Sequence, residues 1–106
     1  MNKIDLVRKM EEYVGAYRQQ LDKYEGSSLS MLSNQAKNGI KALKSTVKNN
    51  EQAGKALESL REYMDKFEQA VKSGDRKVSA KAVEMMEKTL RNLKEKTGKD
   101  DHKDHS

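Results

Sequence analysis

Four lysines with helical spacing are the residues of this chain best suited to chemistry. They are Lys37, Lys41, Lys44 and Lys48, and residues 27–50 hold no acidic residue to balance them. Steps of four, three and four residues place side chains in one row along an α-helix. Such a row can attract the phosphates of a nucleic acid or the carboxylates of an acidic partner. We therefore treat it as a candidate binding surface.

The same row also has a purely structural interpretation. Each lysine directly follows an apolar residue, so its aliphatic stem can cover the edge of a core. Its ammonium group can then meet a carboxylate of a neighbouring helix, for which the sequence offers Glu11, Glu12, Glu58 and Glu62. The row has no arginine and no interleaved aromatic residue, so nucleic acid binding through it would be non-specific and sensitive to salt. Both interpretations stay open at this stage.

Residues that could carry catalysis or hold a metal are sparse. The chain has no cysteine, and its two histidines, His102 and His105, lie near the C-terminus among charged residues. Serines gather between residues 27 and 33, where the start and the capping of a helix account for them. The glycines are scattered singly and form no phosphate-binding loop. We therefore expect no catalytic residue, no metal, no cofactor and no enzymatic activity.

A second candidate group consists of aromatic residues and a turn glycine. Tyr24 lies two residues before Gly26, and Tyr63 lies four residues before Phe67 on what would be one side of a helix. Aromatic side chains in a small protein mostly fill the core, with tyrosine hydroxyls at its rim. Core packing is thus the first interpretation, and partner binding by Tyr24, Gly26, Tyr63 and Phe67 is the second.

Apolar residues that recur every three or four positions define the elements that would position these groups. This spacing is typical of amphipathic helices. Gly26 is suited to end the first helix, and the segment 73–75 to separate the last two. The last stripe fades at Thr97–Gly98, and the polar residues 99–106 are expected to form a disordered tail. The stripes span Val7–Tyr24, Leu29–Val71 and Val78–Leu93.

The middle stripe leaves two architectures open. If Asn49 ends one helix and Asn50 caps the next, four helices of similar length pack as an up-down-up-down bundle. If residues 28–72 form one helix, it is about 67 Å long at about 1.5 Å per residue. The molecule then has three helices and an apolar seam that needs a partner. The similar lengths favour four helices.

Composition sets the remaining limits. Charged residues make up 37% of the 106 residues, whereas Leu, Ile, Val and Phe together number only 18. So few large apolar residues exclude a sheet-based domain and a large buried active-site cavity. The longest apolar run is two residues, which leaves no candidate for a membrane span or a cleaved signal peptide. We expect a cytoplasmic protein, with export independent of a signal peptide left open.

The first turn carries a resemblance to a known family. Tyr24-Glu25-Gly26 stands between two amphipathic helices, and residues 1–72 resemble the helix-WXG-helix hairpin of the small bacterial type VII (ESX-type) secretion proteins. Tyr24 takes the place of the family's Trp, and Gly26 that of its Gly. The resemblance implies a dimer of hairpins exported without a cleavable signal. The chain departs from the family in its helix after Gly74 and in Phe67, which stands where an acidic residue four positions after Tyr63 would complete the export motif.

Together these patterns predict an all-α protein. Residues 1–98 form an antiparallel helical bundle of four helices, or three if residues 28–72 are continuous, followed by the tail at 99–106. The narrow apolar stripes are marginal alone, which favours a protein partner or a homo-oligomer. We expect a non-enzymatic protein acting by protein–protein interaction, as an adaptor, chaperone, inhibitor or self-assembling subunit. The alternative is a non-specific nucleic-acid-binding protein that uses the lysine row.

Overall fold

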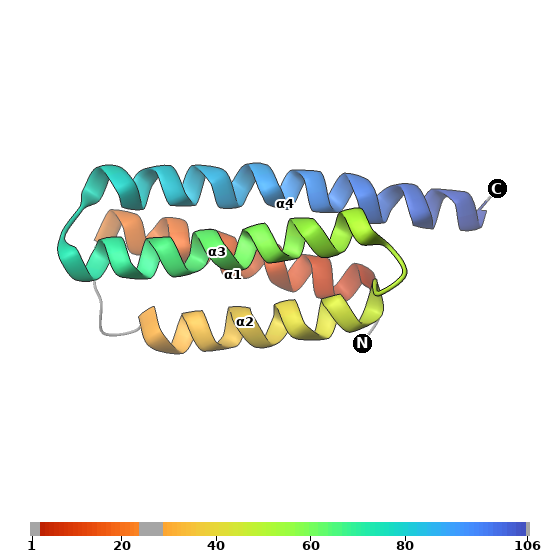
Figure 1. Ribbon diagram of the computed structural model, residues 1–106, viewed down its shortest axis with the longest axis horizontal. Coiled ribbons are helices and arrows are strands. Elements are labelled where there is room, and N and C mark those ends of the chain that lie inside the picture. Colours follow the sequence, from red (N-terminus) through yellow and green to blue (C-terminus); the bar gives the residue numbers. More distant parts are fainter. Residues whose placement is uncertain (1–2, 24–28, 106) are drawn as a thin grey trace.

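The computed structural model describes the backbone of residues 3–23 and 29–105 and the side chains of residues 3–23 and 29–97. Four helices alternate in direction and form an antiparallel bundle of about 48 × 22 × 19 Å (Figure 1). Each helix packs on two neighbours, α1 and α3 each lying against both α2 and α4, and α3 and α4 approach most closely. The predicted all-α bundle is therefore confirmed. The helices are α1 (Lys3–Lys23), α2 (Leu29–Thr46), α3 (Glu51–Ser73) and α4 (Arg76–His105).

A capped turn between α2 and α3 decides in favour of four helices. Asn50 has an extended backbone (φ −113°, ψ 96°), and its Oδ1 accepts a hydrogen bond of 3.1 Å from the N–H of Ala53. This cap satisfies one of the unpaired N–H groups at the start of α3. Val47, just before the turn, stays buried at 5% exposure. The chain thus reverses without losing its apolar stripe, and a continuous helix over 28–72 is wrong.

The turn between α3 and α4 forms as the sequence predicts. Gly74 has φ +74°, a left-handed conformation that glycine adopts without strain. The N–H of Asp75 donates to the carbonyl of Ala70 at 2.8 Å, which closes the end of α3. The carboxylate of Asp75 accepts a hydrogen bond of 3.1 Å from the N–H of Val78 and caps α4. Both helix ends are therefore satisfied within a short connection.

The core is a single cluster to which all four helices contribute. Phe67 is fully buried and packs edge-on against Tyr17, with ring centroids 5.3 Å apart. The Tyr17 hydroxyl lies inside the core and not at its rim, and burial raises its pKa to about 12 although the hydroxyl of Ser33 acts in the opposite direction. Among the described residues all four helices close this cluster, in place of the open apolar seam expected of three helices.

The apolar stripe of α4 differs from the predicted one at its start. Val78 is 45% exposed, whereas Ser79 is fully buried and Val83 lies in the core. The Oγ of Ser79 donates to the carbonyl of Asp75 at 2.7 Å, so the buried hydroxyl of Ser79 has a partner. The cap at Asp75 fixes where α4 begins, and the small Ser79 and Ala82 then suit the close approach to α3. The expectation that Val78 belongs to the core is therefore wrong.

The end of α4 projects past the other three helices (Figure 1). Thr97 is buried, and its hydroxyl donates to the carbonyl of Leu93 at 3.0 Å. It is the last residue whose side chain is described, although the helical backbone continues to His105. The tail predicted to be disordered, residues 99–106, has its side chains outside the described residues. In Figure 1 no other helix accompanies this end, which fits a segment that has no part in the core.

Candidate interaction surfaces

The lysine row lies at the border between α2 and α3. Lys37, Lys41 and Lys44 line a cleft of about 320 Å³ together with Arg61 and Glu58 of α3. We call this hollow the α2–α3 cleft. Ile40, buried in the core, lines it as well. Lys48 is exposed and does not line the cleft. The structure therefore brings three of the four predicted lysines together.

Two lysines of the row are paired with carboxylates of α3. Lys37 Nζ lies 2.6 Å from Asp65 Oδ1, and Lys44 pairs with Glu58. The hydrogen bond from Lys44 is the main cause that lowers the pKa of the Glu58 carboxyl. The structural interpretation of the row thus holds for Lys37 and Lys44. Lys41 is exposed like Lys48, and neither forms an ion pair in the described part of the chain.

Arg61 is the member of this cleft that the sequence reasoning missed. It directly follows the buried Leu60 of α3, just as each lysine of the row follows an apolar residue of α2. That shared position next to the apolar stripe was the available signal. Arg61 gives the cleft a planar guanidinium group, which the lysine row itself lacks.

A second surface follows the border between α3 and α4. Two adjoining hollows of about 360 and 300 Å³ lie along it, and Tyr63 lines both. We call the two hollows together the α3–α4 groove. The larger hollow is lined by Tyr63, Lys66, Val78, Lys81, Ala82 and Met85. The smaller one is lined by Gln52, Lys55, Ala56, Ser59, Tyr63, Thr89, Asn92 and Lys96.

The larger hollow has an apolar floor that is open to solvent. Val78 is one of three large apolar side chains with high exposure in the described residues, and Tyr63 and Met85 are half-buried. Lys66 Nζ lies 5.7 Å from the centroid of the Tyr63 ring, within the range of a cation–π interaction. This end of the groove therefore combines apolar and cationic surface.

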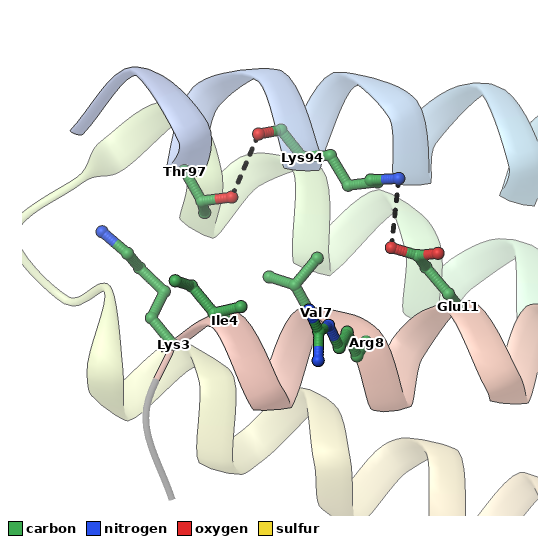
Figure 2. A pocket seen from close by; sticks show the side chains of 7 residues that line it. All are labelled: Lys3, Ile4, Val7, Arg8, Glu11, Lys94 and Thr97. Carbon is green, nitrogen blue, oxygen red and sulfur yellow. Dashed lines mark hydrogen bonds and ion pairs between the residues drawn. The ribbon is translucent and has the colours of Figure 1, made fainter. Parts of the chain in front are cut away.

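A third hollow of about 310 Å³ lies between the start of α1 and the late turns of α4 (Figure 2). Ile4, which is 51% exposed, and Val7 point from α1 toward α4. The ion pair between Lys94 Nζ and Glu11 Oε1, 3.1 Å long, crosses its wall. Because this pair already joins the two helices, we rank the hollow below the α3–α4 groove as a candidate binding site.

The other predicted site residues have different outcomes. Phe67 lies wholly in the core, so its predicted partner contact is wrong for the folded chain. Tyr63 lies in the α3–α4 groove, where a partner can reach it. Tyr24 and Gly26 lie outside the described residues, and with them the turn on which the WXG resemblance rests. That resemblance stays a prediction.

The described residues were also searched for metal sites and membrane spans. They hold no group of three or more His, Cys, Asp or Glu side chains placed to bind a metal ion. Within the same part of the chain, no helix has the length and apolar character needed to cross a bilayer. His102 and His105 fall beyond the described side chains.

Comparison with known proteins adds no relative. The chain matches no protein-family model, no curated protein and no solved structure. Any functional argument must therefore come from the surfaces themselves.

Proposed function

We propose that this chain is a non-enzymatic protein-binding module that receives its partner in the α3–α4 groove. The observation that supports this function is the apolar floor formed by Tyr63, Val78 and Met85 at the surface of a bundle whose core is already closed. Tyrosine and methionine are side chains that interfaces favour, since one is rigid and amphipathic and the other adapts its shape.

The fold does not require this apolar floor. Ser79, Ala82 and Val83 make the buried contacts of the first turns of α4, and Val78 stands outside them. A polar side chain at position 78 would suit the first turn of a helix. Because Val78 shares one hollow with Tyr63 and Met85, the three together favour a contact with another molecule.

Capture from extracts of the native host tests this function. We expect immobilised wild-type chain to retain a protein at high salt, and Val78→Glu to retain at least about tenfold less because it places a charge in a dry contact. Met31→Glu is the matched control, since Met31 is 67% exposed on α2 and does not line the groove. Circular dichroism should show equal helicity for all three proteins. Equal capture by all three contradicts the proposal.

A second function, non-specific binding of nucleic acid, has one observation in its favour. Arg61 joins Lys41 at the α2–α3 cleft, and neither forms an ion pair in the described part of the chain. Lys37 and Lys44 are already engaged with carboxylates, which weakens the attraction of the row for phosphates. We therefore rank this function second.

Elution from a polyanion column tests the second function. Replacing Lys37, Lys41, Lys44 and Lys48 by Gln should lower the salt concentration at elution if phosphates bind the row. A variant of equal net charge, with Gln at the lysines of the α3–α4 groove, should then elute close to the wild type. Unchanged elution of the row variant rules out the lysine row as a nucleic acid site.

A further inference from the structure

The helix borders of this bundle differ in how their charges are balanced. Among the described residues, ion pairs join α2 to α3 and α1 to α4, whereas none is seen between α3 and α4 or between α1 and α2, where the helices approach closely at Gly39. Four lysines nevertheless line the α3–α4 groove, and no acidic residue lines it. None of these four lysines is in an ion pair within the described part of the chain. The ion pairs between α2 and α3 are Lys37–Asp65 and Lys44–Glu58, and those between α1 and α4 are Arg18–Glu87 and Lys94–Glu11.

The four lysines stand in two pairs at the two ends of the groove. Lys55 and Lys96 line the smaller hollow, and Lys66 and Lys81 line the larger one. Lys66 lies eleven positions after Lys55 in α3, which is about 16 Å along the helix at about 1.5 Å per residue. Lys96 lies fifteen positions after Lys81 in α4, which is about 22 Å. An occupant that meets both pairs must therefore carry negative charge at two places about three to four helical turns apart.

The space between the lysine pairs is asymmetric. The larger hollow offers Tyr63, Val78 and Met85, whereas polar side chains such as Ser59 and Asn92 dominate the smaller one. A complementary occupant buries apolar side chains near Lys66 and Lys81 and keeps polar side chains toward the other end.

The two helices that form the groove also determine which backbone conformation a bound segment can have. The groove is formed by two helices, whose backbone N–H and C=O groups are bonded within each helix, so an added strand finds no edge to pair with. A helix satisfies its own backbone and can lie along a straight groove between two others. Single-stranded nucleic acid is a poorer match, because Tyr63 is the one aromatic side chain lining the described groove and base stacking needs several platforms.

We propose that the α3–α4 groove binds an acidic amphipathic helix of a partner protein. Apolar side chains of that helix pack on Tyr63, Val78 and Met85, and its carboxylates meet the lysine pairs at the two ends. This inference rests on the proposed protein-binding function and names the chemistry of the segment that is bound. The partner supplies the carboxylates that α3 and α4 do not supply to each other.

Designed helical peptides of about sixteen residues test the inference by fluorescence anisotropy with the full chain. The first has two leucines four residues apart near one end and glutamates at both ends. The second has glutamine in place of each glutamate, and the third has lysine. We expect the glutamate peptide to bind, the glutamine peptide to bind at least about tenfold more weakly, and the lysine peptide not to bind.

Two variants of equal net charge locate the binding. Gln at Lys55, Lys66, Lys81 and Lys96 should weaken binding of the glutamate peptide by about tenfold or more, because the charges that face it are gone. Gln at the exposed Lys9, Lys23, Lys41 and Lys48 should change the affinity by less than about threefold, since those charges lie elsewhere and are screened. Amide NMR shifts on adding the glutamate peptide should concentrate in α3 and α4.

Several outcomes overturn the inference. Equal affinities for the glutamate and glutamine peptides would show that the carboxylates do not contribute to binding. Equal losses of affinity in the two quadruple Lys→Gln variants would show that only the net charge of the chain matters. Displacement of the glutamate peptide by oligothymidylate at matched charge points to nucleic acid. A dimer that Val78→Glu dissociates, detected by sedimentation, points to a second copy of the chain.

Failure of the inference and failure of the proposed function are distinguishable. If no glutamate peptide binds but wild-type chain still captures a protein that Val78→Glu loses, the acidic-helix inference is wrong and the protein-binding function stands. If Val78→Glu captures that protein as well as the wild type does, the proposed function is wrong whatever the peptides do.

Discussion

The α2–α3 cleft and the α3–α4 groove are both bordered by lysines, but the lysines have different surroundings. In the cleft, Lys37 and Lys44 meet carboxylates of the facing helix. In the groove, Lys66 and Lys81 flank an apolar floor and meet no carboxylate within the described residues. The same residue type thus closes one border of the bundle and leaves another available.

A count of charges therefore says little about how a helical surface is used. Exposed ion pairs contribute only about 0–1 kcal/mol each, so the paired lysines matter mainly as covers of the core edge. Unpaired lysines beside exposed apolar side chains cost little in the free protein and are available to a ligand. The paired lysines thus cover the core edge at one border, and the unpaired lysines belong to the border at which we propose that a partner binds.

Two adjacent methionines of α4 give the largest expected contrast. Met86 is fully buried, whereas Met85 is half-buried and lines the groove. Met86→Ala should lower the free energy of unfolding by about 2–5 kcal/mol through lost burial and a cavity. Met85→Ala should lower it by less than about 1 kcal/mol, because a surface side chain loses few contacts. Urea titration followed by circular dichroism measures both.

In the peptide-binding experiment we expect the opposite order, with the larger loss of affinity in Met85→Ala. At a temperature where Met86→Ala is still folded, it should bind the glutamate peptide like the wild type, whereas Met85→Ala should bind it about threefold or more weakly. Similar losses of stability in the two variants would mean that the groove floor is part of the core, and the contrast between the borders would disappear.

Much of the fold could be predicted from spacing and caps. Asn50 and Gly74 are of residue types that favour the start and the end of a helix, and both act in the structure as the sequence suggested. The stripe of α4 was predicted one position out of phase at its start, because Val78 is more apolar than Ser79. Its phase is set by the cap at Asp75 and by close packing on α3, which apolar periodicity alone does not report.

The candidate site was harder to predict, because it depends on which residues of different helices face each other. The lysine row was visible as a pattern within one helix, but its carboxylate partner Asp65 was not among those expected. Tyr63 lines the α3–α4 groove and Phe67 lies buried in the core, although the two look alike in sequence. The lysines of the groove come from two helices, so no single stretch of sequence displays them.

The border between α1 and α2 is closed in a third way, by close approach, and offers the next largest effect. A Cβ atom at Gly39 would collide with the end of Met10 and lie 3.1 Å from the ring of Tyr13. Met10 is fully buried, so it has little room to move. Gly39→Ala should therefore cost about 1 kcal/mol despite the better helix propensity of alanine.

Gly54→Ala is the matched control for this border. A Cβ atom there would meet nothing within 4 Å, so alanine should raise the free energy of unfolding by up to about 1 kcal/mol. Thermal melts of the two variants should shift in opposite directions. Stabilisation by both would show that the α1–α2 border is loosely packed.

The smallest predicted effect concerns the pH dependence of the paired borders. Arg18 donates two hydrogen bonds, of 2.6 and 2.7 Å, to Glu87, and these hydrogen bonds are the main cause that lowers the pKa of the Glu87 carboxyl. A carboxyl whose pKa is lower in the folded state contributes stability above its unfolded pKa of about 4.3, and the contribution is lost as the pH falls through the folded pKa. Arg18 is exposed and Glu87 is only half-buried, so water screens the pair and we expect only a few tenths of a kcal/mol.

Urea titrations at neutral and acidic pH measure this effect. Glu87→Gln should be slightly less stable than the wild type at neutral pH and equal to it once the carboxyl is protonated in acid. Glu95→Gln is the control, because Glu95 is exposed and forms no ion pair in the described part of the chain. If Glu87→Gln and Glu95→Gln behave alike, the α1–α4 pair adds nothing beyond net charge, and the borders then differ only in their apolar contacts.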